Sequence, residues 1–165
     1  MSAATGPGEV PEVTPAAEPV RAVVVTQLGA AEPVAAICAI AGLEVDAVLS
    51  AVGVLVWCRD TAPGAPEQVA AALTRATPGL PAVLLVHRDG RIVAHTWLDG
   101  AAGDELASGL VLDGAPEALS NLLIGTETMD GFPDVVTSVG VGRLKAMRMM
   151  AKAGRAARRD RKKAV

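Results

Sequence analysis

Apolar residues recur along the chain in short runs whose spacing predicts alternating strands and helices. The β-branched run from Val20 to Leu28 predicts a buried strand, and Val54 to Cys58 predicts another. Four further segments have helical spacing and predict helices. They run from Glu32 to Gly42, from Val45 to Val52, from Pro66 to Ala76 and from Pro116 to Ile124. The residues that we expect to face inward are Val34, Ile37, Cys38, Ala41, Val69, Ala72, Leu73, Ala76, Leu119, Leu122 and Leu123.

The strongest local signal lies between Pro81 and Gly100, where two apolar runs flank the dipeptide Asp89-Gly90. Such a dipeptide between apolar runs predicts a β-hairpin. With a two-residue turn, His95 faces Leu84, and His87 and His95 point to opposite sides of the sheet. With a three-residue turn the two histidines share a face but lie far apart along it. In neither register does the hairpin alone let them hold one metal ion.

The order of these elements predicts a single α/β domain over residues 20–134. We expect a mixed sheet with a central β-hairpin and with helices on its faces. Residues 101–113 give no clear signal. Residues 1–19, with four prolines and three glutamates, predict a disordered leader. Residues 135–165 predict a basic amphipathic helix that ends in a charged tail.

The segment around the hairpin resembles thioredoxin-like folds. Leu80-Pro81 precedes the hairpin and Gly100 follows it, and the resemblance implies a cis peptide bond before Pro81. It covers roughly Val20 to Ile124 and rests on topology. The Cys-x-x-Cys motif of thioredoxins is absent, because the corresponding place reads Leu-Gly-Ala-Ala-Glu-Pro over residues 28–33. The hairpin is also similar to those of roadblock-type small binding domains.

Composition gives indications of the cellular compartment and the type of genome from which the protein comes. The two cysteines have no metal-ligand spacing, and such sparse use is typical of a reducing cytoplasm. There is no apolar stretch long enough to span a bilayer, and the N-terminus does not read as a signal peptide. The excess of arginine over lysine and the abundance of alanine are typical of GC-rich bacterial genomes. No motif predicts a cofactor or a metal ion.

Charge divides the chain into two parts. Residues 1–141 hold 17 acidic and 5 basic residues, a net charge of −12, whereas residues 142–165 hold 1 acidic and 10 basic residues, a net charge of +9. Leu144, Met147, Met150 and Ala151 recur at helical spacing within the basic segment and predict its apolar face. The candidate partner-binding residues are Arg143, Lys145, Arg148, Lys152, Arg155, Arg158, Arg159, Arg161, Lys162 and Lys163.

The other candidate sites are weaker. Cys58 ends a strand and is followed by Arg59, a position where a reactive thiol could arise, but a small buried side chain is the simpler interpretation. Asp99, Asp104 and the acidic loop 127–134 would have to converge to hold a cation, so a solvated acidic surface is favoured. Gly140 and Gly142 precede the basic helix, where they could form an anion-binding nest, although a hinge is favoured.

These patterns predict a non-catalytic binding or adaptor protein. Its basic C-terminal helix would engage an acidic protein surface or a nucleic acid, and an anionic membrane is less favoured because the apolar face has no bulky aromatics. Two alternatives leave the tail without a partner: the helix packs on its own acidic domain, or the last dozen residues are solvated. A thioredoxin-like enzyme or a thiol-dependent protein centred on Cys58 is the alternative function.

Overall fold

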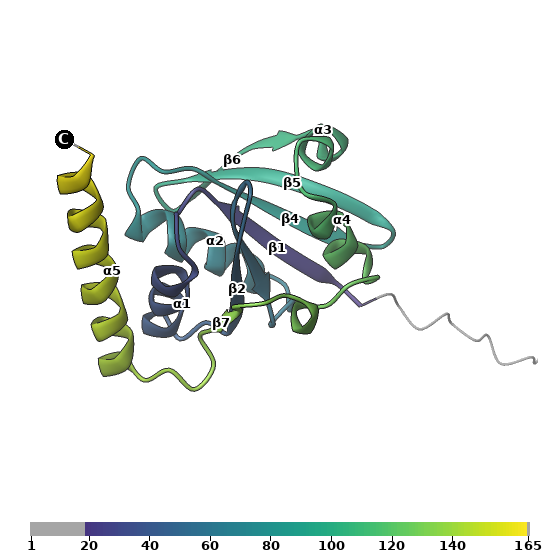
Figure 1. Cartoon of the computed structure of the whole chain (residues 1–165). Coiled ribbons are helices and arrows are strands. Elements are labelled where there is room, and N and C mark those ends of the chain that lie inside the picture. The colour runs from purple at the N-terminus through teal and green to yellow at the C-terminus, as the bar shows by residue number, and fades with distance from the viewer. Residues whose placement is uncertain (1–18, 165) are drawn as a thin grey trace, which may run out of the picture.

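The structure, a computed structural model, describes residues 19–164 (Figure 1). The predicted leader lies outside these residues, apart from Pro19. Within them the strands are β1 (Arg21–Thr26), β2 (Val45–Ser50), β3 (Gly53–Cys58), β4 (Ala82–Arg88), β5 (Arg91–Leu98), β6 (Ala101–Leu106) and β7 (Val136–Thr137). The helices are α1 (Ala31–Ile40), α2 (Ala65–Ala76), α3 (Ser108–Asp113), α4 (Glu117–Ile124) and α5 (Arg143–Lys163), with a 3₁₀ turn at Met129–Gly131.

All the strands join one sheet in the order β6-β5-β4-β1-β3-β2-β7. Every neighbouring pair is antiparallel. The sequence β1-α1-β2-β3-α2-β4, with β1 lying between β3 and β4, is the order of the split β-α-β, ferredoxin-like motif. The predicted α/β class is confirmed, but the sheet is antiparallel in every pair rather than mixed.

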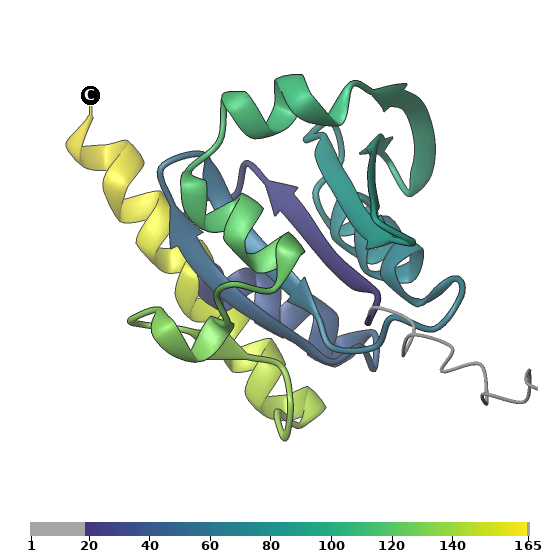
Figure 2. The same cartoon turned by 90° about the vertical axis from the view of Figure 1, so that its right-hand side faces the viewer.

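Helices cover both faces of the sheet (Figures 1 and 2). On one face α1 and α2 pack over Ala22 and Val24 of β1 and Leu84 of β4. On the other face α4 packs over Val23 and Leu85, and the apolar side chains of α3 contact the same cluster. Alternate residues of β1 thus enter opposite cores, as the period of two in a strand requires. Helix α5 forms an outer layer against α1.

The predicted helices at α1, α2 and α4 are confirmed, and their inward positions are mostly correct. Val34, Val69 and Leu119 are buried, as are most of the other predicted inward residues. Ala41 and Ala76 are instead exposed. Both lie at the C-terminal end of their helix, where the chain leaves the sheet, so helical spacing no longer places them against the core.

The helix predicted over Val45 to Val52 is wrong, because this segment forms β2 and the turn after it. Asp46 pairs with Trp57 and Ser50 with Gly53, so β2 and β3 form a tight hairpin. A short apolar run fits a helix or a buried strand equally well by periodicity, and pairing with β3 decides the outcome. Gly53 has a φ of 116°, and any Cβ there would collide with the carbonyl oxygen of Thr26.

The predicted hairpin is confirmed in its two-residue register. Arg88 pairs with Arg91 and Leu84 with His95. Asp89 and Gly90 both have positive φ, of 52° and 72°, as a type I′ turn requires. His87 and His95 therefore point to opposite faces of the sheet.

The resemblance to thioredoxin-like folds gains no support from the structure. No two neighbouring strands run parallel within the described residues. No peptide bond in this range is cis, including the bond before Pro81. Residues 101–113, which gave no clear signal, form the edge strand β6 and the short helix α3.

Candidate functional site

The segment that leads into α5 is fixed to the sheet by Ser138. The Oγ atom of Ser138 accepts a hydrogen bond from the Val45 N–H at 2.8 Å and donates one to the Leu43 carbonyl oxygen at 2.7 Å. Gly140, with a φ of 74°, and Gly142 at the N-cap then turn the chain into the helix. These contacts fix where α5 begins.

Helix α5 packs against α1 through a narrow stripe of small and flexible side chains. Ala146 is fully buried, and Met149, Met150 and Ala153 are half-buried. Met150 reaches the core beneath α1. The intervals of three, four and seven residues place these side chains on one face of the helix. This stripe anchors the N-terminal half of α5.

A second apolar stripe on α5 faces solvent. Leu144 is 64% exposed and Met147 is 52% exposed, and Ala151 is exposed as well. Of the four residues of the predicted apolar face, only Met150 packs against the core. The side chain of Ala146 lets the two helix axes approach closely, which turns the bulkier Leu144 and Met147 away from α1.

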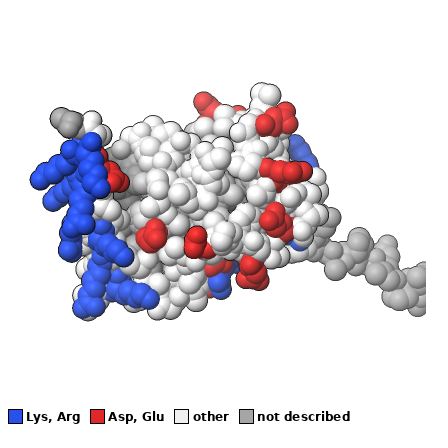
Figure 3. Space-filling view, viewed as in Figure 1, with Lys and Arg blue, Asp and Glu red and all other residues white. Residues whose placement is uncertain are grey.

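All ten candidate lysines and arginines on α5 are exposed. Figure 3 shows Lys and Arg side chains gathered along α5 on the face in view, whereas acidic side chains are scattered over the rest of that face. Between residues 19 and 164 the one ion pair joins Arg59 to Asp46 at 2.8 Å. The positive charge of α5 is thus not neutralised by acidic groups of its own domain.

The C-terminal part of α5 extends beyond the end of α1, the helix on which α5 packs. The helix has 21 residues and α1 has 10, which at about 1.5 Å per residue correspond to about 31 Å and 15 Å. Every residue from 154 to 164 is exposed. Of the two alternatives without a partner, packing on its own domain describes the first half of the helix only, and it occurs through apolar side chains rather than through charges.

Cys58 lies in the core at the end of β3 and is only 1% exposed. Burial raises the pKa of the Cys58 thiol far above its ordinary value, and the nearby Cys38 and Glu67 raise it further. Burial also raises the pKa of Cys38 to about 12. A thiol that is protonated and shielded from solvent is a poor nucleophile. The geometry gives the alternative enzyme reading no support.

The acidic side chains do not gather into a metal site in the part of the chain that the structure describes. Asp99 instead accepts a hydrogen bond from the Gly79 N–H at 2.9 Å. This contact joins the loop after α2 to the turn between β5 and β6, so Asp99 has a structural role.

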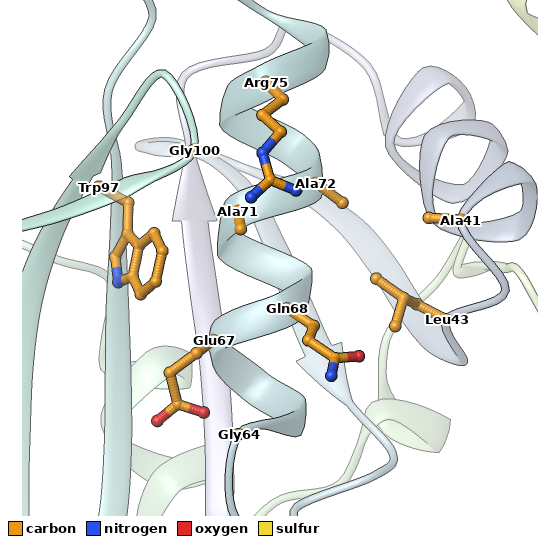
Figure 4. Close-up of a pocket in the computed structure, with 10 residues that line it drawn as sticks. All are labelled: Ala41, Leu43, Gly64, Glu67, Gln68, Ala71, Ala72, Arg75, Trp97 and Gly100. Carbon is orange, nitrogen blue, oxygen red and sulfur yellow. The ribbon is translucent and has the colours of Figure 1, made fainter.

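A site that the sequence did not predict lies beside α2. Two pockets, of about 440 and 370 Å³, share Glu67 of α2 and Trp97 of β5 as lining residues. Figure 4 shows the larger pocket, with Arg75 and Glu67 extending from the same helix and the indole of Trp97 beside them. The only signal in the sequence was the isolated tryptophan in the second strand of the hairpin.

No helix among residues 19–164 combines the length and the apolar character needed to cross a bilayer. Comparison of the whole chain with protein-family models, with characterised proteins and with solved structures found no match.

Proposed function

We propose that the protein is a non-catalytic binding or adaptor protein that engages an anionic partner through α5. The observation that carries this proposal is the exposure of all ten basic side chains of α5 without one ion pair to the described part of the chain. Such a surface attracts polyanions over about one Debye length, roughly 8–10 Å at physiological salt. The N-terminal half of α5 is already fixed in position by its packing on α1, which lowers the entropy lost on binding.

The outward apolar stripe favours an acidic protein surface over a nucleic acid. At about 100° per residue, Leu144, Met147 and Ala151 line up, with Arg143 on one side of them and Arg148 on the other. A helix with apolar anchors between cations matches an apolar groove with an acidic rim. Phosphate backbones are bound by cations and polar groups, and they would leave Leu144 and Met147 in contact with water.

The proposal is tested by fluorescence anisotropy of the full-length chain with three labelled probes. They are a glutamate–phenylalanine copolymer, polyglutamate of the same length, and a 20-base-pair DNA duplex of random sequence. We expect the copolymer to bind most tightly at low salt, and its affinity to fall steeply as salt is raised, because the charges screen each other.

Two double variants separate charge from apolar contact. Arg148→Glu with Lys152→Glu is expected to weaken copolymer binding about tenfold or more, equivalent to about 1.4 kcal/mol. Leu144→Ser with Met147→Ser is expected to remove the preference for the copolymer over polyglutamate. Arg88→Glu with Arg91→Glu makes the same charge change on the hairpin and is the matched control.

Three results contradict the proposal. If none of the probes binds at low salt, α5 has no anionic partner of these classes. If the duplex binds most tightly, the partner is a nucleic acid rather than a protein. If the hairpin control weakens binding as much as the α5 charge variant does, net charge rather than α5 determines affinity.

A further inference from the structure

Two buried polar atoms beside α2 have no hydrogen-bond partner within residues 19–164. They are Oε2 of Glu67 and Nε1 of Trp97. Trp97 is only 9% exposed, so its indole N–H lies in the interior. A buried donor or acceptor without a partner costs about 1–3 kcal/mol, and more when it carries charge. A ligand that offers both a donor and an acceptor would satisfy both atoms.

Glu67 occupies the third position of α2, where a glutamate often caps the helix by accepting the N-cap N–H. It makes no such bond here. Figure 4 shows its carboxylate directed away from Arg75 and toward the strand side of α2, and it shows the indole nitrogen on the ring edge that is turned away from Arg75. Both groups line the pocket of about 370 Å³ over the β4–β5 hairpin.

The rest of this pocket supplies an apolar floor and positive charge. Val86 of β4 pairs with Val93 of β5, and the neighbouring pair is Leu84 with His95. These side chains share one face of the hairpin, and all of them line the pocket. Arg88, at the exposed end of β4, also lines it. One cavity thus combines an acceptor carboxylate, an N–H donor, a guanidinium and an aliphatic surface.

We propose that this pocket binds a small zwitterion with an aliphatic or aromatic side chain, that is, an apolar α-amino acid. The ammonium group binds the Glu67 carboxylate. The carboxylate group accepts from the Trp97 N–H, and Arg88, six residues along β4 from the position that pairs with Trp97, attracts it from the other end of the pocket. The side chain lies on Val86 and Val93. The cavity is within the roughly 300–1,000 Å³ range of small-molecule sites.

This chemistry uses each unpartnered group once. A carboxylate prefers a charged donor, since charge-assisted hydrogen bonds are about twice as strong as neutral ones. A purely anionic ligand would leave Glu67 unpaired and repelled. A purely cationic ligand would leave the Trp97 N–H without an acceptor. The proposal is independent of α5, which does not line this pocket.

The test follows the Trp97 indole N–H in ¹H–¹⁵N NMR spectra of the full-length protein. Trp57→Phe assigns the two indole resonances. L-leucine, L-valine, L-methionine and L-phenylalanine are titrated separately. Two analogues of leucine complete the series: 4-methylpentanoate, which has no ammonium group, and 3-methylbutylamine, which has no carboxylate. We expect at least one amino acid to shift the Trp97 resonance in a saturable way, and both analogues of leucine to bind about tenfold or more weakly than leucine itself.

Variants of the two charged groups make the assignment specific. Glu67→Gln is expected to weaken amino-acid binding about tenfold or more and Arg88→Gln by a smaller factor, whereas Glu117→Gln on α4 leaves it unchanged. The spectrum of each variant reports whether it is folded, and the exposed Arg88 keeps the test available if Glu67→Gln perturbs α2. The proposal is overturned if no amino acid moves the Trp97 resonance at about 20 mM, since this excludes dissociation constants in the millimolar range. It is equally overturned if Glu67→Gln and Arg88→Gln bind as tightly as the unmodified chain.

Discussion

Replacing Ser138 by alanine tests how α5 is attached to the domain. Ser138 is 5% exposed, and its hydroxyl bridges two backbone groups of the segment that begins β2. Ser138→Ala removes both hydrogen bonds and leaves the Val45 N–H and the Leu43 carbonyl oxygen without this partner. The backbone bond from the Ser138 N–H to the Val45 carbonyl oxygen, at 2.9 Å, remains.

The magnitude follows from these two lost bonds. Each contributes about 1 kcal/mol net, and a buried donor that loses its partner costs about 1–3 kcal/mol. We therefore expect the free energy of unfolding to fall by about 2–3 kcal/mol. With a urea dependence of about 2 kcal/mol per M, the midpoint of unfolding falls by about 1–1.5 M.

The assay is urea unfolding followed by far-ultraviolet circular dichroism. Ser120→Ala, in the middle of α4, is the matched control and should change the midpoint little, because alanine favours a helix. A Ser138→Ala midpoint within about 0.3 M of that of the unmodified protein would refute the reasoning. It would mean that water replaces the hydroxyl and that the attachment does not depend on Ser138.

Three further changes have clear expected outcomes. Gly53→Ala should lower the melting temperature far more than Gly140→Ala, because both positions have positive φ but only Gly53 has no room for a Cβ. Arg59→Met should lower the free energy of unfolding by about 1–3 kcal/mol, measured in urea, because it leaves the buried Asp46 unpaired. An equal loss of stability in the control variant Arg91→Met would contradict this. The thiol of Cys38 ordinarily titrates near 9.0 and titrates at about 12 in the fold, so its contribution to stability is complete below pH 9 and is lost as pH rises from 9 to 12. Stability measured over that range should fall less steeply in Cys38→Ala, and an unchanged slope would contradict the pKa shift.

Local patterns in the sequence were sufficient for several elements. The β-branched run predicted β1, helical spacing with proline near the start predicted α1 and α2, and the dipeptide Asp89-Gly90 predicted the hairpin, although two registers stayed open. In each case neighbouring residues carry the physical cause: the branching of side chains, the fixed φ of proline, or the positive φ of a type I′ turn. The charge division between residues 1–141 and 142–165 is likewise a property of the sequence alone.

Tertiary contacts decided the rest. Residues 45–52 became a strand because β3 lies beside them, and no local signal distinguished this from a helix. The face that α5 turns to α1 was set by the small Ala146 rather than by the larger Leu144, since close helix packing depends on the shape of both partners. Glu67 and Trp97 meet only because α2 packs across the β4–β5 hairpin. Sequence periodicity specifies which residues are apolar on one face of an element. The surface that each such face packs against depends on residues far away in the chain. Both candidate sites result from this packing.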